Sequence, residues 1–305
     1  MHVDELPLVI FTIFAQMSVG AFVVLGVVHL LARRRASTAT VDRLSDPALY
    51  AIGPVMVLGL AASILHLGNP LNAINVLNQL GSSWLSREIL FGCAFAGLGA
   101  AFAVVQWRGW FTPVLRQVLA GVTALVGLGL VWSMAMVYML PTVPAWNSPA
   151  TPVIFFTTTF LLGALAVGSA FVWLLMVQRR RGVAVDDEVT DLVRTSLRWI
   201  AVTSIVLLGV QFVVLPTYAL SLAGAGGAAA TSAASLMTWG GVPLVLRLVL
   251  AFVGAGLLGV FLFKVAVAGR ERLLFTVTLS AFGLVLVSEG LGRALFYESF
   301  TRIGM

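Results

Sequence analysis

Charged side chains are scarce in this chain. Asp, Glu, Lys and Arg together make up 10% of its 305 residues, whereas a typical soluble domain carries about 25%. Hydrophobic residues account for 60%, and the mean hydropathy is +1.04. One soluble core cannot hide so much apolar surface, so the composition predicts a protein embedded in the lipid bilayer. The net charge of +6 comes from short basic clusters, which suit loops at a membrane surface better than a groove for nucleic acid.

Cysteine and histidine are also rare, and this limits the metal chemistry. The lone cysteine, Cys93, can form neither an intrachain disulfide nor a Cys-ligated metal site. The three histidines are His2, His29 and His66. His29 and His66 fall at opposite ends of their expected helices and His2 is terminal, so we expect no haem and no bound metal. Walker A, HExxH, GxSxG and CxxC sequences are missing too, which leaves the common soluble enzyme chemistries without a site.

Long apolar runs, by contrast, are abundant. Eight of them can cross a hydrocarbon core about 30 Å thick. Only helices satisfy every backbone polar group within such a segment. The sequence therefore predicts an all-α fold, a polytopic integral membrane bundle of eight transmembrane helices in a single domain, residues 1–305. The predicted spans are 6–32, 47–65, 86–107, 113–140, 152–177, 198–218, 242–268 and 273–297.

The basic residues are unevenly divided between the two ends of these helices. Of the 18 Lys and Arg residues, 14 fall at one end and the other 4 (Arg87, Arg247, Arg293 and Arg302) at the opposite end. The positive-inside rule assigns the richer end to the cytoplasm. Both termini are then predicted to lie outside, in a multi-pass protein of a prokaryotic cytoplasmic (inner) membrane.

The three longer outer connections differ in composition. Residues 66–86 include HLGNPLNAINVLNQLG, which predicts a capped amphipathic helix over about 70–80, lying in the membrane interface. It is either a cap on the bundle or one wall of a site beside His66. Residues 141–151 are Pro-rich and uncharged, which fits a rigid docking rim or an ordinary connector. Residues 219–241 are rich in Gly, Ala and Ser and are expected to be flexible.

Ionisable residues inside membrane helices are costly and often mark function. Here they gather at the predicted outer end, and we expect no comparable set in the cytoplasmic half. Glu289 and Arg293 are four residues apart and can pair on one helix face, which also fits a purely structural ion pair. Glu88 needs another partner or is kept neutral by burial. The candidate site residues are His66, Glu88, Gln16, Arg247, Glu289 and Arg293.

Four stretches of the chain resemble one known family. They are LPLVIFTIFAQMSVGAF, ILHLGNPLNAINVLNQLGSSWLSREI, VPAWNSPATPVIFF and SEGLGRALFY. These are similar to the membrane anchor subunit of the dimethyl sulfoxide reductase family (DmsC-like). The resemblance implies eight helices with both termini outside, and an anchor that oxidises menaquinol without binding a metal. It also implies a four-cluster iron–sulfur subunit that receives the electrons and a molybdopterin catalytic subunit. The histidine of the HLG block and the glutamate after it, tied to quinol binding in such anchors, are His66 and Glu88 here.

Quinol oxidation releases two electrons and two protons, and a base near each hydroxyl assists it. We expect His66 to accept one proton, because an imidazole titrates near neutral pH, and Glu88 to take or relay the other. Arg293 or Arg247 would orient Glu88 or stabilise negative charge on the quinol oxygen, and Gln16 would line the pocket. Since electrons must leave near the outer surface, the partner subunits are expected on the outer face.

Three other interpretations stay open at this stage. The first is a related polysulfide or nitrite reductase-type anchor, with the same quinone chemistry and other partners. The second is a small-molecule transporter, although transporters tend to place their site near the midplane. The third is a purely structural anchor, which leaves His66 and Glu88 unexplained. In none of them does the sequence carry a complete active site of its own.

Overall fold

The computed structural model describes residues 6–33, 36–66, 78–182, 186–238, 241–268 and 271–303, which are helical with short turns and contain no strand. Eight stretches of helix are long and apolar enough to cross a membrane, which confirms the predicted all-α class and the number of spans. The helices are α1 (Leu6–Ala32), α2 (Thr38–His66), α3 (Trp84–Arg108), α4 (Pro113–Tyr138), α5 (Ala150–Arg180), α6 (Asp187–Ala225), α7 (Gly227–Thr238), α8 (Gly241–Ala251), the π-helical segment Phe252–Leu257, α9 (Leu258–Ala268) and α10 (Glu271–Glu298).

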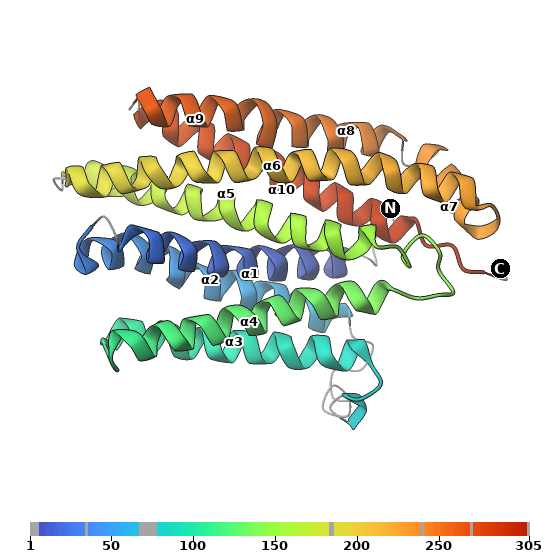
Figure 1. Ribbon diagram of the computed structural model, residues 1–305, viewed down its shortest axis with the longest axis horizontal. Coiled ribbons are helices and arrows are strands. Elements are labelled where there is room, and N and C mark those ends of the chain that lie inside the picture. Colours follow the sequence, from blue (N-terminus) through green and yellow to red (C-terminus); the bar gives the residue numbers. More distant parts are fainter. Residues whose placement is uncertain are drawn as a thin grey trace.

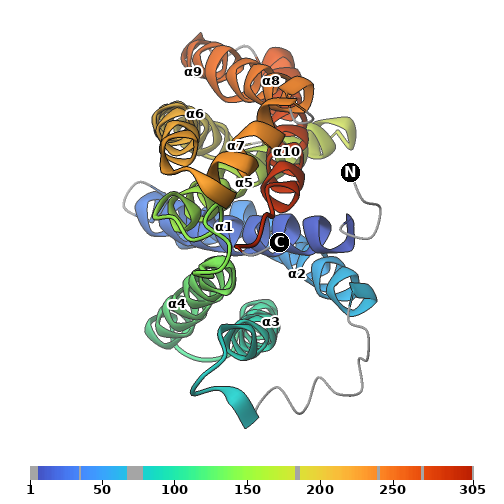
Figure 2. The same ribbon diagram turned by 90° about the vertical axis from the view of Figure 1, so that its right-hand side faces the viewer.

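The helices run side by side along the long axis of the bundle (Figure 1). Viewed from one end, α1 lies in the middle, with α3 and α4 on one side and α6, α8 and α9 on the other (Figure 2). The helix α1 begins and α10 ends at the same end of the bundle, which we name the N/C end. The placement of both termini outside the membrane stays a prediction.

Two helices extend well beyond their predicted spans. α2 begins at Thr38 and not at residue 47, and α6 runs from Asp187 to Ala225 and not over 198–218. The side chain of Asp186 caps α6 by accepting from the backbone N–H of Glu188 at 3.1 Å, so this helix starts within a charged segment. An apolar run marks the part of a helix that lies in lipid, and these helices continue past it.

Residues 219–238, expected to form a flexible connection, are helical except for one turn. α6 continues to Ala225, and a turn at Gly226, where φ is 72°, leads into α7. The Ser232 hydroxyl donates to the carbonyl oxygen of Ser299 at 2.9 Å, which fastens α7 to the segment that follows α10. Ala229 and Ala233 are buried against Leu222. The small residues here allow close helix packing, which composition alone does not separate from flexibility.

Glycine allows α1 and α5 to cross in direct backbone contact. A Cβ atom added at Gly20 would collide with the carbonyl group of Thr159, and one at Gly163 would collide with the backbone of Gly20. Small residues at such a crossing let two membrane helices approach closely, and dispersion contacts then hold them together. This contact fixes α1 against α5, and both helices contribute to the site described below.

We expect Gly20→Ala to lower the stability of the chain by about 1–3 kcal/mol, because the added methyl group forces the two backbones apart. Gly97→Ala is the matched control, since a Cβ at Gly97 meets no atom within 4 Å. Thermal unfolding in detergent measures both variants. Equal midpoints for Gly20→Ala and Gly97→Ala would show that the crossing tolerates a wider spacing.

Candidate functional site

Five candidate site residues come together in a buried cluster in the half of the bundle nearest the N/C end. Gln16 on α1 is fully buried, and Glu88, Arg247, Glu289 and Arg293 are between 2% and 5% exposed. They come from four different helices, α1, α3, α8 and α10. Four buried charged groups in membrane helices require compensation from one another or from hydrogen bonds.

Arg293 occupies the centre of this cluster. Its Nη2 donates to Oε1 of Gln16 at 2.9 Å. Its guanidinium carbon lies 3.7 Å from the ring centroid of Phe155, close enough for a cation–π contact. Arg293 Nε and Nη1 and Gln16 Nε2 are buried without a hydrogen-bond acceptor in the described part of the chain. Three buried donors therefore point to a ligand or to ordered water.

Both carboxylate oxygens of Glu289 are satisfied by neutral donors. Thr158 donates its hydroxyl to Oε2 at 2.6 Å, and Gln211 donates Nε2 to Oε1 at 2.8 Å. Within the described residues Glu289 therefore forms no direct ion pair with Arg293, although the i,i+4 spacing allowed one. Arg247 on α8 and Arg293 on α10 are both close enough to Glu289 to interact with it electrostatically. This single carboxylate therefore partly offsets the positive charge of two arginines.

Arg247 reaches α10 where that helix has no side chain. A Cβ atom at Gly292 would collide with the guanidinium group of Arg247, and the Ser288 hydroxyl donates to the carbonyl oxygen of Arg247 at 2.8 Å. The π-helical segment Phe252–Leu257 follows α8 directly. Such segments alter the phase of a helix and are frequent at functional sites.

Glu88 lies beside two tyrosines that the sequence reasoning missed. The hydroxyl oxygens of Tyr138 and Tyr297 are 3.1 Å apart, and Tyr297 donates to the hydroxyl of Thr12 at 3.4 Å. Both tyrosines are within electrostatic reach of Glu88. Glu88 itself is 5% exposed, and no described residue gives it a hydrogen bond or an ion pair. The Glu88 carboxyl can therefore accept a hydrogen bond from a ligand or from ordered water.

The comparison with known protein families matches residues 1–298 to the DMSO reductase anchor subunit (DmsC). The chain belongs to the DmsC family. It is 32% identical over 301 residues to an anaerobic dimethyl sulfoxide reductase chain of Haemophilus influenzae, covering 99% of this chain and 96% of that protein. It is 38% identical over 162 residues to the corresponding protein of Escherichia coli, and this match spans 53% of the chain and about half (55%) of that relative. A shorter match, 31% identical over 118 residues, covers 33% of the chain and 36% of a sulfite dehydrogenase subunit of Allochromatium vinosum.

The membership in the DmsC family and the eight apolar helices show that the chain is a multi-pass membrane protein and an anchor subunit of the DMSO reductase type. The expected resemblance is thereby confirmed. The contribution of each site residue to the function of this DmsC-family chain remains a proposal, and it rests on the geometry above.

His66 is the last residue of α2 in this DmsC-family chain, and its side chain lies outside the described part of the structure. The predicted interfacial helix at about 70–80 also falls mostly outside it, because residues 67–77 are not described. Where the description resumes, the side chain of Arg87 donates to the carbonyl oxygens of Leu80 and Gly81 at 2.9 and 2.8 Å. Arg87 therefore fastens this connection to the start of α3.

The connection between α4 and α5 is ordered by Trp146. Its indole N–H donates to the carbonyl oxygen of Phe296 at 2.8 Å, and the two rings stack with centroids 5.5 Å apart. Tyr218 donates its hydroxyl to the carbonyl oxygen of Ala145 at 2.6 Å. Trp146 therefore ties the uncharged 141–151 segment to the end of α10.

A cavity of about 510 Å³ lies beside the cluster, among α5, α6, α7, α8 and α10. Its walls are mainly apolar, with Arg247, Tyr218 and Ser299 as polar exceptions. Phe296 lines this cavity and also touches Tyr138. Phe296 therefore belongs both to the wall of this cavity and to the aromatic cluster around Tyr138.

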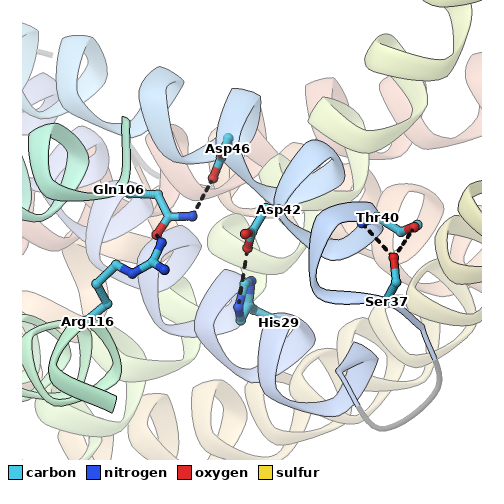
Figure 3. A network of polar contacts seen from close by, with 7 residues as sticks. All are labelled: His29, Ser37, Thr40, Asp42, Asp46, Gln106 and Arg116. Atoms are coloured by element: carbon cyan, nitrogen blue, oxygen red, sulfur yellow. Dashed lines mark hydrogen bonds and ion pairs between the residues drawn. The ribbon is translucent and has the colours of Figure 1, made fainter. Parts of the chain in front are cut away.

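The end opposite to the N/C end also carries a polar set, although its charged side chains are only half-buried. At the end opposite to the N/C end, Gln106 donates Nε2 to Asp46 at 3.1 Å, and Arg116 donates Nη1 to the amide oxygen of Gln106 at 3.1 Å. His29 Nε2 lies 3.8 Å from a carboxylate oxygen of Asp42. Figure 3 shows these side chains converging from α1, α2, α3 and α4. They line a second cavity, of about 260 Å³.

Proposed function

We propose that this chain anchors a molybdenum-containing respiratory oxidoreductase in the prokaryotic inner membrane, oxidises menaquinol, and passes the electrons to an iron–sulfur subunit. The observation that supports this most is the carboxyl of Glu88, which is 5% exposed, receives no hydrogen bond from a described residue, and lies within electrostatic reach of Tyr138 and Tyr297, the two tyrosines that also neighbour Arg293. The relatives are named as parts of anaerobic dimethyl sulfoxide reductases, which agrees with an anaerobic respiratory complex of this kind.

The free hydrogen-bonding groups of the cluster fit a quinol head group. A quinol hydroxyl needs an acceptor when it enters a buried site, and its oxygen accepts from a donor as the proton leaves. Glu88 offers acceptor oxygens to which no described residue donates, while Arg293 Nε, Arg293 Nη1 and Gln16 Nε2 offer donors without a described acceptor. Gln16 is ten residues along α1 from Leu6, or about 15 Å at the rise of an α-helix. The head group would therefore lie between the N/C end and the middle of a hydrocarbon core about 30 Å thick.

Each residue then has a distinct role. Glu88 accepts one proton from the quinol and relays it toward the N/C end, and His66 accepts the other. Arg293 is held by Gln16 and by the ring of Phe155, so its position is set before the ligand binds, and it stabilises negative charge on the quinol oxygen. The negative charge of Glu289 partly offsets the positive charges of Arg247 and Arg293. The isoprenoid chain lies among the apolar side chains of α1, α2 and α3.

The proposed partners dock at the N/C end. Electrons leave the quinol there, so a four-cluster iron–sulfur subunit covers this end and a molybdopterin catalytic subunit lies beyond it. The 141–151 segment suits the docking rim, because Trp146 and Tyr218 hold its backbone in one arrangement. It also carries no charged residue, and interface cores are depleted in charge. The iron–sulfur clusters and the molybdopterin belong to the partners, and this chain is proposed to hold neither metal nor haem.

Binding of a menaquinol analogue to the purified complex tests the site. We expect His66→Ala to weaken binding by about tenfold or more, because the head group loses one charge-assisted or neutral hydrogen bond in a buried site. His29→Ala is the matched control, since His29 lies at the opposite end of the bundle, and it should leave binding unchanged. Equal affinity in His66→Ala and wild type would place the head group elsewhere. No saturable binding by the wild type would favour a transporter or a passive anchor.

A further inference from the structure

The cavity at the opposite end has the make-up of a second binding site, unrelated to the cluster near the N/C end. It has a volume of about 260 Å³ and lies among α1, α2, α3 and α4. Phe22, Leu25, Leu49 and Phe102 form part of its apolar wall. Its polar lining is gathered near the ends of the helices and consists of His29, Arg33, Asp42, Ser45, Asp46, Gln106, Arg116 and Gln117. A pocket with an apolar wall and a polar rim suits an amphiphilic molecule such as a membrane lipid.

Two groups at this rim are buried without a partner among the described residues. Ser45 is 5% exposed, and its hydroxyl forms no hydrogen bond with any described residue. Arg116 Nε is also buried without a hydrogen-bond acceptor among the described residues. Arg116 and Asp46 are meanwhile held in place through Gln106, which accepts from one and donates to the other. The cavity thus presents a preorganised donor and a hydroxyl, and groups buried without partners in a native structure point to a bound molecule.

The charges around the cavity specify the kind of amphiphile. Among the described lining residues, Asp42 and Asp46 supply two carboxylates, and Arg33 and Arg116 supply two guanidinium groups. Gln106 donates to Asp46, and His29 lies 3.8 Å from Asp42, but each carboxylate can accept further hydrogen bonds. An anionic lipid would place its phosphate beside these carboxylates without offering them a donor. A quinone offers only acceptors at its carbonyls, so both carboxylates would remain without a donor from it. A ligand that carries one ammonium and one phosphate matches both signs.

We propose that this cavity binds a zwitterionic phospholipid with a primary ammonium head group, phosphatidylethanolamine. The ammonium group donates to Asp42 and Asp46, and the phosphate accepts from Arg116 and Arg33. One acyl chain lies along Phe22 and Leu49. The site is at the end predicted to face the cytoplasm, where the helix ends meet the head groups of the lipid. The lipid would contact all four helices that line the cavity, α1, α2, α3 and α4.

Lipid retention measured by native mass spectrometry tests the proposal. The intact complex is delipidated in detergent and then exposed to phosphatidylethanolamine, phosphatidylcholine or phosphatidylglycerol with identical acyl chains. We expect one phosphatidylethanolamine to be retained about tenfold better than phosphatidylcholine, because a trimethylammonium group cannot donate hydrogen bonds to carboxylates. Asp46→Asn should reduce this preference by a similar factor.

Filling the cavity with a larger side chain is an independent test of the proposal. Gly26 lines the cavity, and a Cβ atom there meets nothing within 4 Å, so Gly26→Leu is designed to extend a side chain from this position into the space proposed for the lipid. Gly97→Leu is the matched control, because its Cβ is equally unobstructed and it does not line the cavity. We expect retention to be lost only in Gly26→Leu, with menaquinol oxidation unchanged in both variants.

Two results would overturn the proposal and show that the cavity holds only ordinary surrounding lipid. They are equal retention of all three lipids, and no effect of Gly26→Leu on retention. Displacement by a menaquinone analogue would also overturn it and reassign the cavity to a quinone.

Discussion

Replacing Glu88 by Gln should slow menaquinol oxidation by about a hundredfold or more, which is the contribution of a positioned general base. The amide has nearly the shape of the carboxyl but cannot take a proton. Glu88 makes no hydrogen bond or ion pair with any described residue, so the substitution removes no described contact that holds α3 in place. Its effect should therefore fall on the reaction and not on the fold.

The experiment compares two electron donors. Turnover with a menaquinol analogue reports the proposed site, whereas a viologen dye delivers electrons directly to the partner subunits. Glu88→Gln should lose the first activity and keep the second. Asp187→Asn, an acid-to-amide change at the exposed start of α6, should keep both. Wild-type quinol turnover in Glu88→Gln would exclude Glu88 as the base, and loss of both activities would indicate a role in assembly.

The spans could be predicted from the sequence because bilayer insertion depends on a property that each residue carries by itself. α1 and the predicted segment 6–32 agree at both ends. The longer ends of α2 and α6 could not be predicted in this way. Beyond the hydrocarbon core a helix continues as long as local capping and packing allow, as Asp186 shows at the start of α6. A search for apolar runs does not detect those forces.

The candidate site was predictable only in part, for a related reason. An isolated Glu or Arg in an apolar helix is conspicuous, so Glu289 and Arg293 were found. Thr158 and Gln211, which donate to Glu289, were not found. Neutral polar residues are common in membrane helices, and only the fold shows that these two contact a carboxylate. The two tyrosines beside Glu88 are 159 positions apart and meet only in the folded chain.

The polar cavity at the opposite end was not predicted, because its charged residues were interpreted as residues that flank the apolar spans. Arg116 was counted with the basic residues that set the orientation, and Asp42 and Asp46 precede the predicted span that starts at residue 47. The early start of α2 brings both carboxylates onto the helix and turns them toward α1 and α3. The missed helix boundary therefore accounts for the two carboxylates, whereas His29, Gln106 and Arg116 lie within predicted spans and come together only in the fold.

Glu289→Gln should cause the largest loss of stability of any single substitution proposed for this chain. The change preserves shape, and a Gln oxygen can still accept from Thr158 or from Gln211. It removes the negative charge that lies within reach of Arg247 and Arg293, both of which are buried. Breaking a buried charge balance by removing one member costs about 3–5 kcal/mol. We expect a lower thermal midpoint in detergent and less assembled complex in the membrane.

A second substitution separates charge balance from local geometry. Combining Glu289→Gln with Arg293→Gln removes one charge of each sign, so the double variant should lose less stability than the sum of the two single changes. Combining Glu289→Gln with Arg302→Gln should be additive, because Arg302 is exposed near the end of the chain. Additivity in both pairs would show that Glu289 does not compensate Arg293. An unchanged midpoint with reduced quinol turnover would mean that Glu289 is retained for the reaction, since a carboxylate that contributes no stability has no structural reason to be buried among three helices.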